Sequence, residues 1–364
     1  MNTDLDFMRL ALRLARRGFG HASPNPMVGA VLVRGGVVVG QGWHHRAGQA
    51  HAEILALAAA GPRARGATLF VTLEPCSTHG RTPPCTDAII TAGIRRVVVA
   101  AEDPNPAHCG RGFVILRRAG LAVTTGLLAD EAADLNQAFN HWITHGTPLV
   151  TVKAAMSLDG RIATVTGESR WITGPKARAC AMKLRAGADA ILAGVNTILM
   201  DDPSLTVRLP GFKDKPWRRV ILDPRARMPL TAKVVSDPFA SSTVVVVTKA
   251  APTGRAAALG ARVRVIRAPA RHGGIDLRWL LRKLGRENVT SLLVEGGGET
   301  NAAFVLQGLA HRAAFFYAPL VLGGRAAPKA VAGAGVARVR DAFALRGAQW
   351  RRLGPEILLT ARFD

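Results

Sequence analysis

Three potential metal ligands, His51, Cys76 and Cys85, constrain the fold of this chain more than any other feature of its sequence. One imidazole and two thiols, with the carboxyl group of Glu53 two residues after the histidine, are the donor set of a catalytic zinc centre that has a separate proton carrier. Three protein ligands leave the fourth position of a tetrahedral zinc ion open for water. The fold must therefore bring three separate segments of the chain to one point.

The surrounding residues predict local structure that suits such a centre. His51 and Glu53 begin a run of strong helix formers that ends at Gly61-Pro62, so both side chains lie in the first turn of a helix. Cys85 follows two prolines, which favour a second helix start, and Cys76 lies in the loop after an apolar strand. Helix N-termini and metals both stabilise thiolates. A lone cysteine is usually a small buried residue, but this combination predicts one zinc ion per chain.

His79 lies between the two cysteines and is the alternative nitrogen ligand; we retain His51, which already fills that role. Cys109 and Cys180 have no ligand-like neighbours and are expected to be ordinary packing or surface residues. Four cysteines in 364 residues do not make a disulfide framework, which indicates a reducing compartment. The acidic N-terminus lacks a signal-peptide pattern, and no apolar run is long enough to span a membrane. We therefore expect a cytoplasmic protein.

Strand and helix patterns alternate along the whole chain, which is long enough for two cores. We place the boundary at Gly146-Thr-Pro148, giving domains of residues 1–146 and 147–364. In the first domain the expected helices are 4–17, 51–60, 85–90, 112–119 and 130–143, and the expected strands are 30–33, 37–39, 68–72, 95–100 and 121–124. In the second domain the expected strands are 149–154, 190–193, 220–222, 244–247, 263–266, 291–294, 312–317 and 357–360, with helices at 175–184, 277–284 and from about 300. The pattern predicts a three-layer α/β first domain and an α/β second domain.

The segment Glu74-Pro-Cys-Ser-Thr-His-Gly-Arg-Thr-Pro-Pro-Cys85 resembles the zinc segment of the bifunctional deaminase/reductase family of riboflavin biosynthesis. Eight residues separate its cysteines, as in that family, whereas the general deaminase signature has two. Pro24-Asn-Pro-Met-Val-Gly29, His51-Ala-Glu53 and Asp103-Pro-Asn-Pro106 carry the same resemblance.

This resemblance implies a cytidine-deaminase-like first domain that hydrolytically deaminates 2,5-diamino-6-(5-phosphoribosylamino)pyrimidin-4-one. Glu53 would be the catalytic proton shuttle, with zinc on His51, Cys76 and Cys85. It also implies that Asn25 and His44 contact the base and that Arg81 binds the substrate phosphate, for which a planar guanidinium is suited. The alternative for Arg81 is a solvated loop arginine.

The second domain carries the other half of the resemblance. Ser291-Leu-Leu-Val-Glu-Gly-Gly-Gly-Glu-Thr300 runs from a strand through glycines into a helix, which suits phosphate binding but is on its own more often only a tight turn. Residues 153–160, 167–173, 196–197 and 201–208 resemble the reductase half of the same family. That half is similar in fold to dihydrofolate reductase and uses NADPH. The resemblance implies hydride transfer that reduces the ribosyl group to a ribityl chain.

Two sets of site residues in the second domain follow from the resemblance. The NADPH-binding set is Ala155, Trp171, Thr197, Asp201, Gly297, Gly298, Glu299, Thr300, Asn301, Ala302 and Ala303. The substrate-binding set is Lys153, Ser169, Arg185, Leu205, Arg208 and Glu295. Arg185 and Arg208 suit phosphate, and Lys153 and Glu295 are candidates for electrostatic stabilisation or proton supply. The alternatives are a solvated helix face for Arg185, core packing for Trp171 and capping for Asp201.

The net charge of +23 raises a second hypothesis, a nucleic-acid-acting zinc deaminase with a basic appended domain. However, the basic residues are spread along the chain, doublets such as Arg218-Arg219 are isolated, and no run is interleaved with aromatic residues. We interpret them as solvated arginines that also attract a phosphorylated substrate. The expected partner is thus a small phosphorylated pyrimidine, with no nucleic acid and no membrane, in a homo-oligomer of unspecified size. A third hypothesis, a non-catalytic binding protein, is disfavoured by the intact metal ligands and Glu53.

Overall fold

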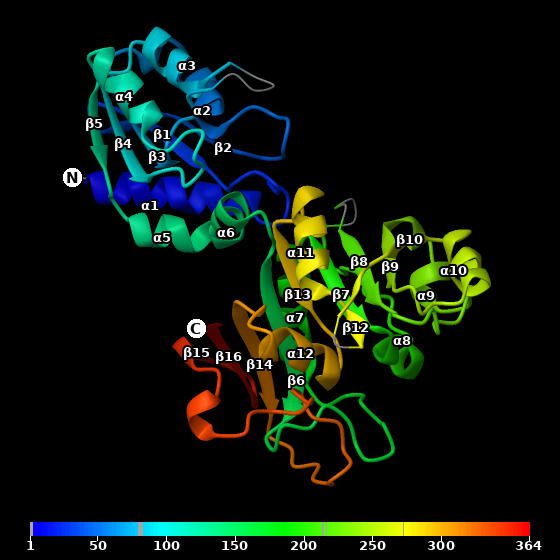
Figure 1. Ribbon diagram of the computed structural model, residues 1–364. Helices are drawn as coiled ribbons and strands as arrows, with labels where there is room; N and C mark the ends of the chain where they lie inside the picture. The colour runs from blue at the N-terminus through cyan, green and yellow to red at the C-terminus, as the bar shows by residue number, and fades with distance from the viewer. Residues whose placement is uncertain (1–2, 79–82, 213–214, 216, 272) are drawn as a thin grey trace. The chain divides into compact units, whose positions relative to one another are not determined.

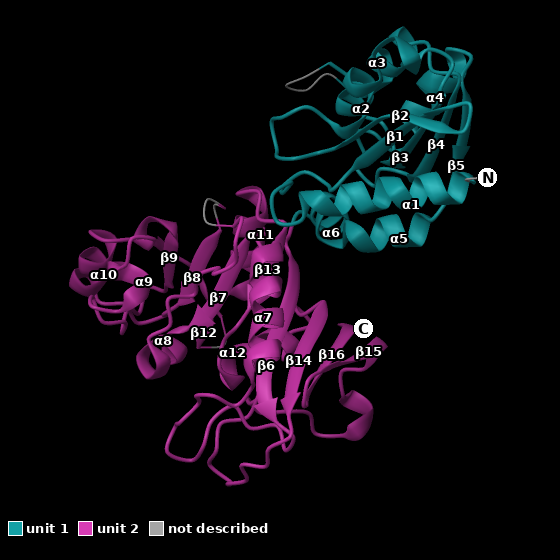
Figure 2. Cartoon of the chain, turned by 180° about the vertical axis from the view of Figure 1, so that it is seen from behind, with its two compact units in different colours: residues 1–146 teal, residues 147–364 magenta. Residues whose placement is uncertain are grey.

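The chain divides into two compact units, Met1–Gly146 and Thr147–Asp364, in a computed structural model that describes residues 3–78, 83–212, 215, 217–271 and 273–364 (Figure 2). The division lies in the segment where the sequence suggested a boundary. Each unit has its own sheet and its own buried apolar clusters. None of the described helices combines the length and the apolar character needed to cross a membrane.

The first unit is built on a five-stranded sheet in the order β2-β1-β3-β4-β5 (Figure 1). Its strands are β1 (Gly29–Arg34), β2 (Val37–Trp43), β3 (Thr68–Leu73), β4 (Arg96–Ala101) and β5 (Ala122–Thr125). β1 pairs antiparallel with β2 and β3, and β3, β4 and β5 are parallel. Because side chains alternate along a strand, Ala30 and Leu32 join one buried cluster while Val31 and Val33 join the other. Both faces of this sheet are therefore covered.

Helices cover the two faces, which confirms the expected three-layer architecture. They are α1 (Asp4–Ala15), α2 (Ala52–Ala60), α3 (Cys85–Thr91), α4 (Arg111–Arg118), α5 (Ala129–Leu135) and α6 (Gln137–His145). α1 and α5 contribute to one buried cluster, and α2, α3 and α4 contribute to the other.

The prediction of a single helix at 130–143 is wrong, because the chain forms two helices, α5 and α6, with a break at Asn136. The side-chain amide of Asn136 accepts a hydrogen bond from the Met27 N–H at 2.8 Å and donates one to the Met27 carbonyl at 3.0 Å. This contact joins residues distant in the sequence, so local helical periodicity could not indicate the break.

Close packing of β2 against α2 fixes the helix that follows His51. A Cβ atom at Gly40 would lie 2.3 Å from the Ala56 carbonyl oxygen, and one at Gly42 would lie 2.6 Å from the Ala52 carbonyl oxygen. Neither position accommodates a side chain unless the helix moves. The start of α2 is therefore held against the sheet.

The second unit contains a nine-stranded sheet in the order β10-β9-β8-β7-β13-β6-β14-β16-β15 (Figure 1). Its strands are β6 (Leu149–Ser157), β7 (Ala190–Gly194), β8 (Arg218–Leu222), β9 (Thr243–Val247), β10 (Arg264–Arg267), β13 (Ser291–Val294), β14 (Arg312–Ala318), β15 (Leu345–Leu353) and β16 (Glu356–Phe363). The first seven strands in this order, β10 through β14, are parallel to one another. β16 and β15 then add an antiparallel edge. A small separate hairpin joins β11 (Ala270–Arg271) and β12 (Gly274–Ile275).

Helices lie on both faces of this sheet, so the expected α/β fold of the second domain is confirmed. They are α7 (Pro175–Gly187), α8 (Val195–Asp201), α9 (Lys233–Ser236), α10 (Thr253–Gly260), α11 (Leu277–Arg286) and α12 (Gly298–Leu306). α11 and α12 contribute to the largest buried cluster, and α7 to α10 contribute to the clusters of the other face. The carboxyl ends of the parallel strands β6, β7 and β13 meet at one edge, where ligands of open α/β sheets bind.

Candidate active sites

The three predicted metal ligands meet in the first unit. His51 is the N-cap residue of α2, Cys85 is the first residue of α3, and Cys76 lies in the loop after β3. The Nδ1 atom of His51 lies 3.3 Å from the Cys85 sulfur and 3.5 Å from the Cys76 sulfur. Ligands of a tetrahedral zinc ion lie roughly 3.6–3.8 Å apart, given Zn–N of about 2.1 Å and Zn–S of about 2.3 Å. The donor atoms therefore fit zinc in both kind and spacing.

The two thiols influence each other's ionisation. Hydrogen bonds from the Cys85 thiol, from His51 and from the Cys85 backbone N–H lower the pKa of Cys76 to about 4, against the effect of burial. The hydrogen bond to Cys76, together with burial, raises the pKa of the Cys85 thiol. Cys76 is thus a thiolate at neutral pH, which is the form that binds a metal.

A cavity of about 290 Å³ opens beside these ligands, and its lining includes Asn25, His44, His51, Glu53 and Cys76. Glu53 is buried in the first turn of α2, and burial raises the pKa of its carboxyl group. A buried carboxyl group with a raised pKa is suited to gain and release a proton. The sequence missed several other lining residues, namely His108, Phe139, Trp142 and Ile143.

Asn25 and His44, predicted to contact the base, form a fixed pair in this cavity. Asn25 Nδ2 lies 3.0 Å from His44 Nε2, and His44 Nδ1 lies 3.1 Å from the Ala50 carbonyl oxygen. Burial lowers the pKa of His44, so its neutral ring donates from Nδ1 to Ala50 and accepts at Nε2 from Asn25. Arg81 and the alternative ligand His79 lie outside the described residues.

Glu74 organises the loop that completes this cavity. Its buried carboxylate accepts hydrogen bonds from the backbone N–H groups of Asp103 at 3.2 Å, Gly110 at 2.9 Å and Gly112 at 2.8 Å. Asp103, Asn105 and His108 from this loop line the cavity. The sequence presented Glu74 only as part of a motif; nothing local indicated its partners.

Two cavities in the second unit, of about 420 and 560 Å³, lie where β6, β7 and β13 end. We call them the substrate cavity and the cofactor cavity after the residue sets that they gather. All six predicted substrate residues of this domain line the substrate cavity: Lys153, Ser169, Arg185, Leu205, Arg208 and Glu295. The two cavities share a wall formed by Ile162, Ser169, Thr197, Asp201 and Gly297.

The predicted cofactor residues fall into three groups. Thr197, Asp201 and Gly297 line both cavities, whereas Ala155 and Trp171 line only the substrate cavity. Gly298, Glu299, Thr300 and Ala303 line the cofactor cavity. Asn301 and Ala302 line neither of these two cavities. Both are buried, and Asn301 Nδ2 donates to the Ala330 carbonyl at 2.8 Å.

The core-packing alternative for Trp171 fails on exposure. Trp171 is 67% exposed, so it is not a core residue, and the Arg178 guanidinium carbon lies 4.5 Å from its ring centroid. The Asp201 carboxylate accepts a hydrogen bond from Ser169 Oγ at 2.8 Å, across the shared wall.

Arg185 is engaged within the protein rather than solvated. Its Nε and Nη2 atoms donate to the two carboxylate oxygens of Glu295, each at 2.8 Å, and Lys153 Nζ lies 3.9 Å from Glu295 Oε2. Burial opposes ionisation of Glu295, but the charges of Arg185 and Lys153 lower its pKa to about 2. Glu295 is therefore a carboxylate at neutral pH, and Lys153 is the better of the two proposed proton sources.

The substrate cavity contains further cations that the sequence did not single out, Arg170, Arg178 and Lys233. One signal was present for Arg178, because it lies seven residues before Arg185 on α7 and so shares its helix face. Together with Arg208, these cations make the cavity suitable for a phosphorylated ligand.

Comparison with known proteins gives matches over nearly the whole chain. Residues 148–359 match the model of the RibD C-terminal domain, and residues 1–101 match that of the cytidine and deoxycytidylate deaminase zinc-binding region. The riboflavin biosynthesis protein RibD of Aquifex aeolicus is 42% identical over 356 residues, covering 98% of this chain and 97% of the relative.

Two solved structures extend this likeness to the fold. The RibD structure of Acinetobacter baumannii (form 1) has a TM-score of 0.88 at 38% identity and covers 99% of both chains. The crystal structure of a diaminohydroxyphosphoribosylaminopyrimidine deaminase/5-amino-6-(5-phosphoribosylamino)uracil reductase from Thermotoga maritima has a TM-score of 0.82 at 33% identity, again covering 99% of both chains.

Proposed function

The chain belongs to the RibD family of riboflavin biosynthesis, and from this we infer that it is a bifunctional deaminase and reductase. We propose that the first unit hydrolyses 2,5-diamino-6-(5-phosphoribosylamino)pyrimidin-4-one with release of ammonia. The second unit then reduces the ribosyl group of the deaminated product to a ribityl chain with NADPH. The observation that carries this proposal is the cluster of His51, Cys76 and Cys85 beside the buried Glu53.

In the deaminase unit, His51, Cys76 and Cys85 would hold zinc, whose Lewis acidity activates water at neutral pH. Asn25 and His44 are fixed to one another and present polar edges to the pyrimidine. The Glu53 carboxylate takes a proton from the attacking water and delivers it to the departing amino nitrogen. Its burial favours the protonated form, so the proton is retained between these two transfers.

The residues of the cofactor cavity fit a phosphate-bearing dinucleotide. The first turn of α12 supplies Gly298, Glu299 and Thr300 to its wall, and Arg227 and Arg271 also line it. A Cβ atom at Gly298 would lie 2.1 Å from the Lys329 carbonyl oxygen, so this turn is packed closely and fixed in place. NADPH bound here would supply the hydride.

In the substrate cavity we assign the substrate phosphate to Arg208; Arg178 lines the same cavity. Arg185 holds Glu295 as a carboxylate near Lys153, and we propose that Lys153 stabilises charge or supplies a proton near the reacting carbon. The remaining members of the two predicted residue sets keep their proposed binding roles, and Arg81 keeps its proposed role in the deaminase site.

The comparisons favour this function over a nucleic-acid-acting deaminase, because the second unit matches a reductase family rather than a nucleic-acid-binding one. We propose a small phosphorylated pyrimidine as the partner and the cytoplasm as the location, which agrees with the four free cysteines. We also propose a homo-oligomer. The exposed Trp350 lies on β15, the strand at one edge of the nine-stranded sheet, and an exposed apolar side chain on an edge strand is a point where a second copy could pair.

A coupled assay tests both activities. Purified protein is incubated with the diaminopyrimidine substrate, and ammonia release and NADPH oxidation are followed together with the zinc content. The expected result is one zinc per chain, with ammonia release that precedes NADPH oxidation. Absence of NADPH oxidation, combined with tight binding of single-stranded DNA or RNA that weakens steeply as the salt concentration rises, would instead support the nucleic-acid hypothesis.

A further inference from the structure

Residues 202–208, which we call the substrate segment, form one wall of the substrate cavity without regular secondary structure. Between described residues, the backbone of residues 203–208 makes no hydrogen bond to another backbone group. Asp202 and Leu205 have φ angles of 39° and 48°, in the left-handed region that residues other than glycine adopt only when the surroundings hold them there. The segment therefore depends on side chains from elsewhere for its shape.

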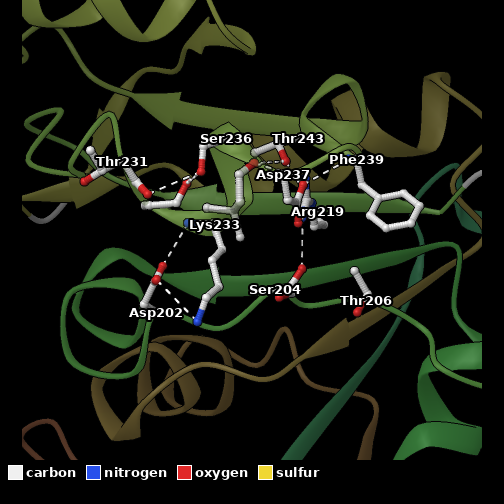
Figure 3. Close-up of polar contacts among 12 residues, drawn as sticks. Asp202, Ser204, Thr206, Arg219, Thr231, Lys233, Ser236, Asp237, Phe239 and Thr243 are labelled. Carbon is white, nitrogen blue, oxygen red and sulfur yellow. Dashed lines mark hydrogen bonds and ion pairs between the residues drawn. The ribbon is translucent and has the colours of Figure 1, made fainter.

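Arg219 of β8 supplies one of these contacts from inside the protein. Its side chain is 0% exposed, and Nη1 donates to the Ser204 carbonyl oxygen at 2.9 Å (Figure 3). The other N–H groups donate to both carboxylate oxygens of Asp237, to the Val234 carbonyl and to Thr243 Oγ1. All five guanidinium N–H groups thus have an acceptor, which fixes the orientation of the group. The sequence interpretation of Arg219 as a solvated arginine is wrong.

Helix α9, which contains one partner of Arg219 and is followed by another, also holds a second point of the substrate segment. Val234 belongs to α9, and Asp237 immediately follows that helix. The first residue of α9, Lys233, donates from its backbone N–H to Asp202 Oδ1 at 2.9 Å, and its Nζ atom lies 3.6 Å from Asp202 Oδ2 (Figure 3). Arg219 therefore acts on Ser204 directly and on Asp202 through α9.

A third contact comes from the site itself, where Arg185 Nη1 donates to the Thr206 carbonyl oxygen at 3.0 Å. Asp202, Ser204 and Thr206 are thus each held by a cationic residue. Leu205, which lies between two of them, lines the cavity, as does Arg208. Arg219 and Asp237 line neither the substrate cavity nor the cofactor cavity, so they do not contact ligands there.

We propose that the buried Arg219–Asp237 pair is a positioning device that sets the affinity of the reductase for its substrate. It holds the substrate segment so that Leu205 and Arg208 meet the substrate, and it stabilises backbone angles that the segment would not keep alone. This inference rests on the proposed reductase function of the second unit. It assigns a role in substrate binding to two residues that never contact the substrate.

The main test is steady-state kinetics of the full chain carrying Arg219→Lys or Asp237→Asn. Lysine keeps the charge but has three donors for five acceptors, so the Ser204 contact should be lost. We expect KM for 5-amino-6-(5-phosphoribosylamino)uracil to rise about tenfold, with KM for NADPH changed less than about twofold. A purely structural role would reduce the amount of active enzyme, and hence the apparent kcat, and would leave the substrate KM unchanged.

Arg218→Gln is the matched control, because Arg218 precedes Arg219 in β8 but pairs with Glu287, whose other ion pairs among the described residues are to Arg264 and Lys283. Its substrate KM should equal that of the wild type. A rise as large as that of Arg219→Lys would mean that any lost ion pair in this strand disturbs the cavity, and would overturn the specific role of Arg219.

A milder pair of variants decides the matter even if the Arg219 and Asp237 variants do not fold. Thr243 Oγ1 accepts from Arg219 Nε at 2.9 Å and donates to the Val234 carbonyl at 2.6 Å. Thr243→Val removes this hydroxyl at nearly constant volume and should raise the substrate KM about threefold, whereas Thr243→Ser keeps it and should not. Equal KM in both variants refutes the proposal. No NADPH oxidation by the wild-type chain would refute the reductase function itself.

Discussion

The deaminase pocket and the reductase substrate cavity each depend on an irregular segment, and the two units hold that segment with opposite charges. In the first unit the buried carboxylate of Glu74 accepts from backbone N–H groups of Asp103 and Gly110 in the loop before α4 and of Gly112 in the first turn of α4. In the second, the buried guanidinium of Arg219 donates to the carbonyls of Ser204 and Val234. A carboxylate only accepts and a guanidinium only donates. The sign of each buried charge therefore follows from which backbone groups the segment leaves without partners.

The two sites also differ in how their functional groups are distributed. The metal ligands and Glu53 lie at the starts of α2 and α3 and in one loop, around a cavity of about 290 Å³. The reductase site gathers residues from β6, from the helices α7 and α8 that flank β7 in the chain, from the glycine turn and α12 after β13, and from the substrate segment. They line two cavities. We expect single changes to abolish the first activity and to reduce the second by degrees.

Removal of zinc should give the largest effect. Dialysis against a chelator should abolish ammonia release, because all three protein ligands serve one ion, and added zinc should restore it. Reduction of already deaminated substrate should continue at close to its original rate, since no ligand comes from the second unit. Loss of both activities together would contradict the separation of the two sites.

Glu53→Gln should lower the deamination kcat by about 10²- to 10⁴-fold, because an amide cannot carry the proton. Zinc content, measured by metal analysis, should stay at the wild-type value. Glu131→Gln, an exposed change in α5, is the matched control and should leave ammonia release unchanged. Retained deamination in Glu53→Gln would remove Glu53 from the mechanism.

Acidic pH should lower the free energy of unfolding of the second unit, because Glu295 becomes protonated. Its folded-state pKa of about 2 lies below the ordinary value of 4.5, so its ion pairs stabilise the fold above pH 4.5, and this contribution is lost as the pH falls toward 2. The shift corresponds to roughly 3 kcal/mol of unfolding free energy at neutral pH. Urea unfolding over this pH range should show a steeper loss for the wild type than for Glu295→Gln. Parallel curves would mean that Glu295 is not stabilised by Arg185 and Lys153.

Arg208→Ala should have the smallest of these effects, a rise of about tenfold in the reductase KM for the phosphorylated substrate with a smaller change in kcat. Steady-state kinetics at a fixed saturating NADPH concentration measures both constants. Arg338→Ala removes an exposed arginine that pairs with Asp341 and should leave KM unchanged. If both variants behave alike, the overall positive charge rather than Arg208 attracts the phosphate.

The three candidate metal ligands lie together in the structure, and the sequence signals that placed each of them are local. His51 precedes a run of helix formers, Cys76 follows an apolar strand and Cys85 follows two prolines. Each of these local signals places one ligand at the start of a helix or at the end of a strand. The same reasoning located β13 and the glycine turn before α12, which contributes Gly297 to the wall shared by the two cavities. It did not predict β15, whose residues from Leu345 to Arg352 are exposed and carry no core pattern.

The remaining features depend on contacts between distant segments. Asn136 breaks a helix because of Met27, and Glu74 organises a loop that begins at Asp103. Arg219 looks like half of an exposed basic doublet, yet its five acceptors come from Ser204, Val234, Asp237 and Thr243. These acceptors come together only in the folded chain, so no periodicity or spacing in the sequence indicates them.

The wall of Ile162, Ser169, Thr197, Asp201 and Gly297 faces both reductase cavities. We therefore expect the pyrimidine and NADPH to influence each other's binding. If bound NADPH changes the affinity for the pyrimidine by some factor, the pyrimidine must change the affinity for NADPH by the same factor. A substitution in this wall, for example at Ser169, whose hydroxyl donates to Asp201, should alter this coupling factor even where it leaves each separate affinity intact.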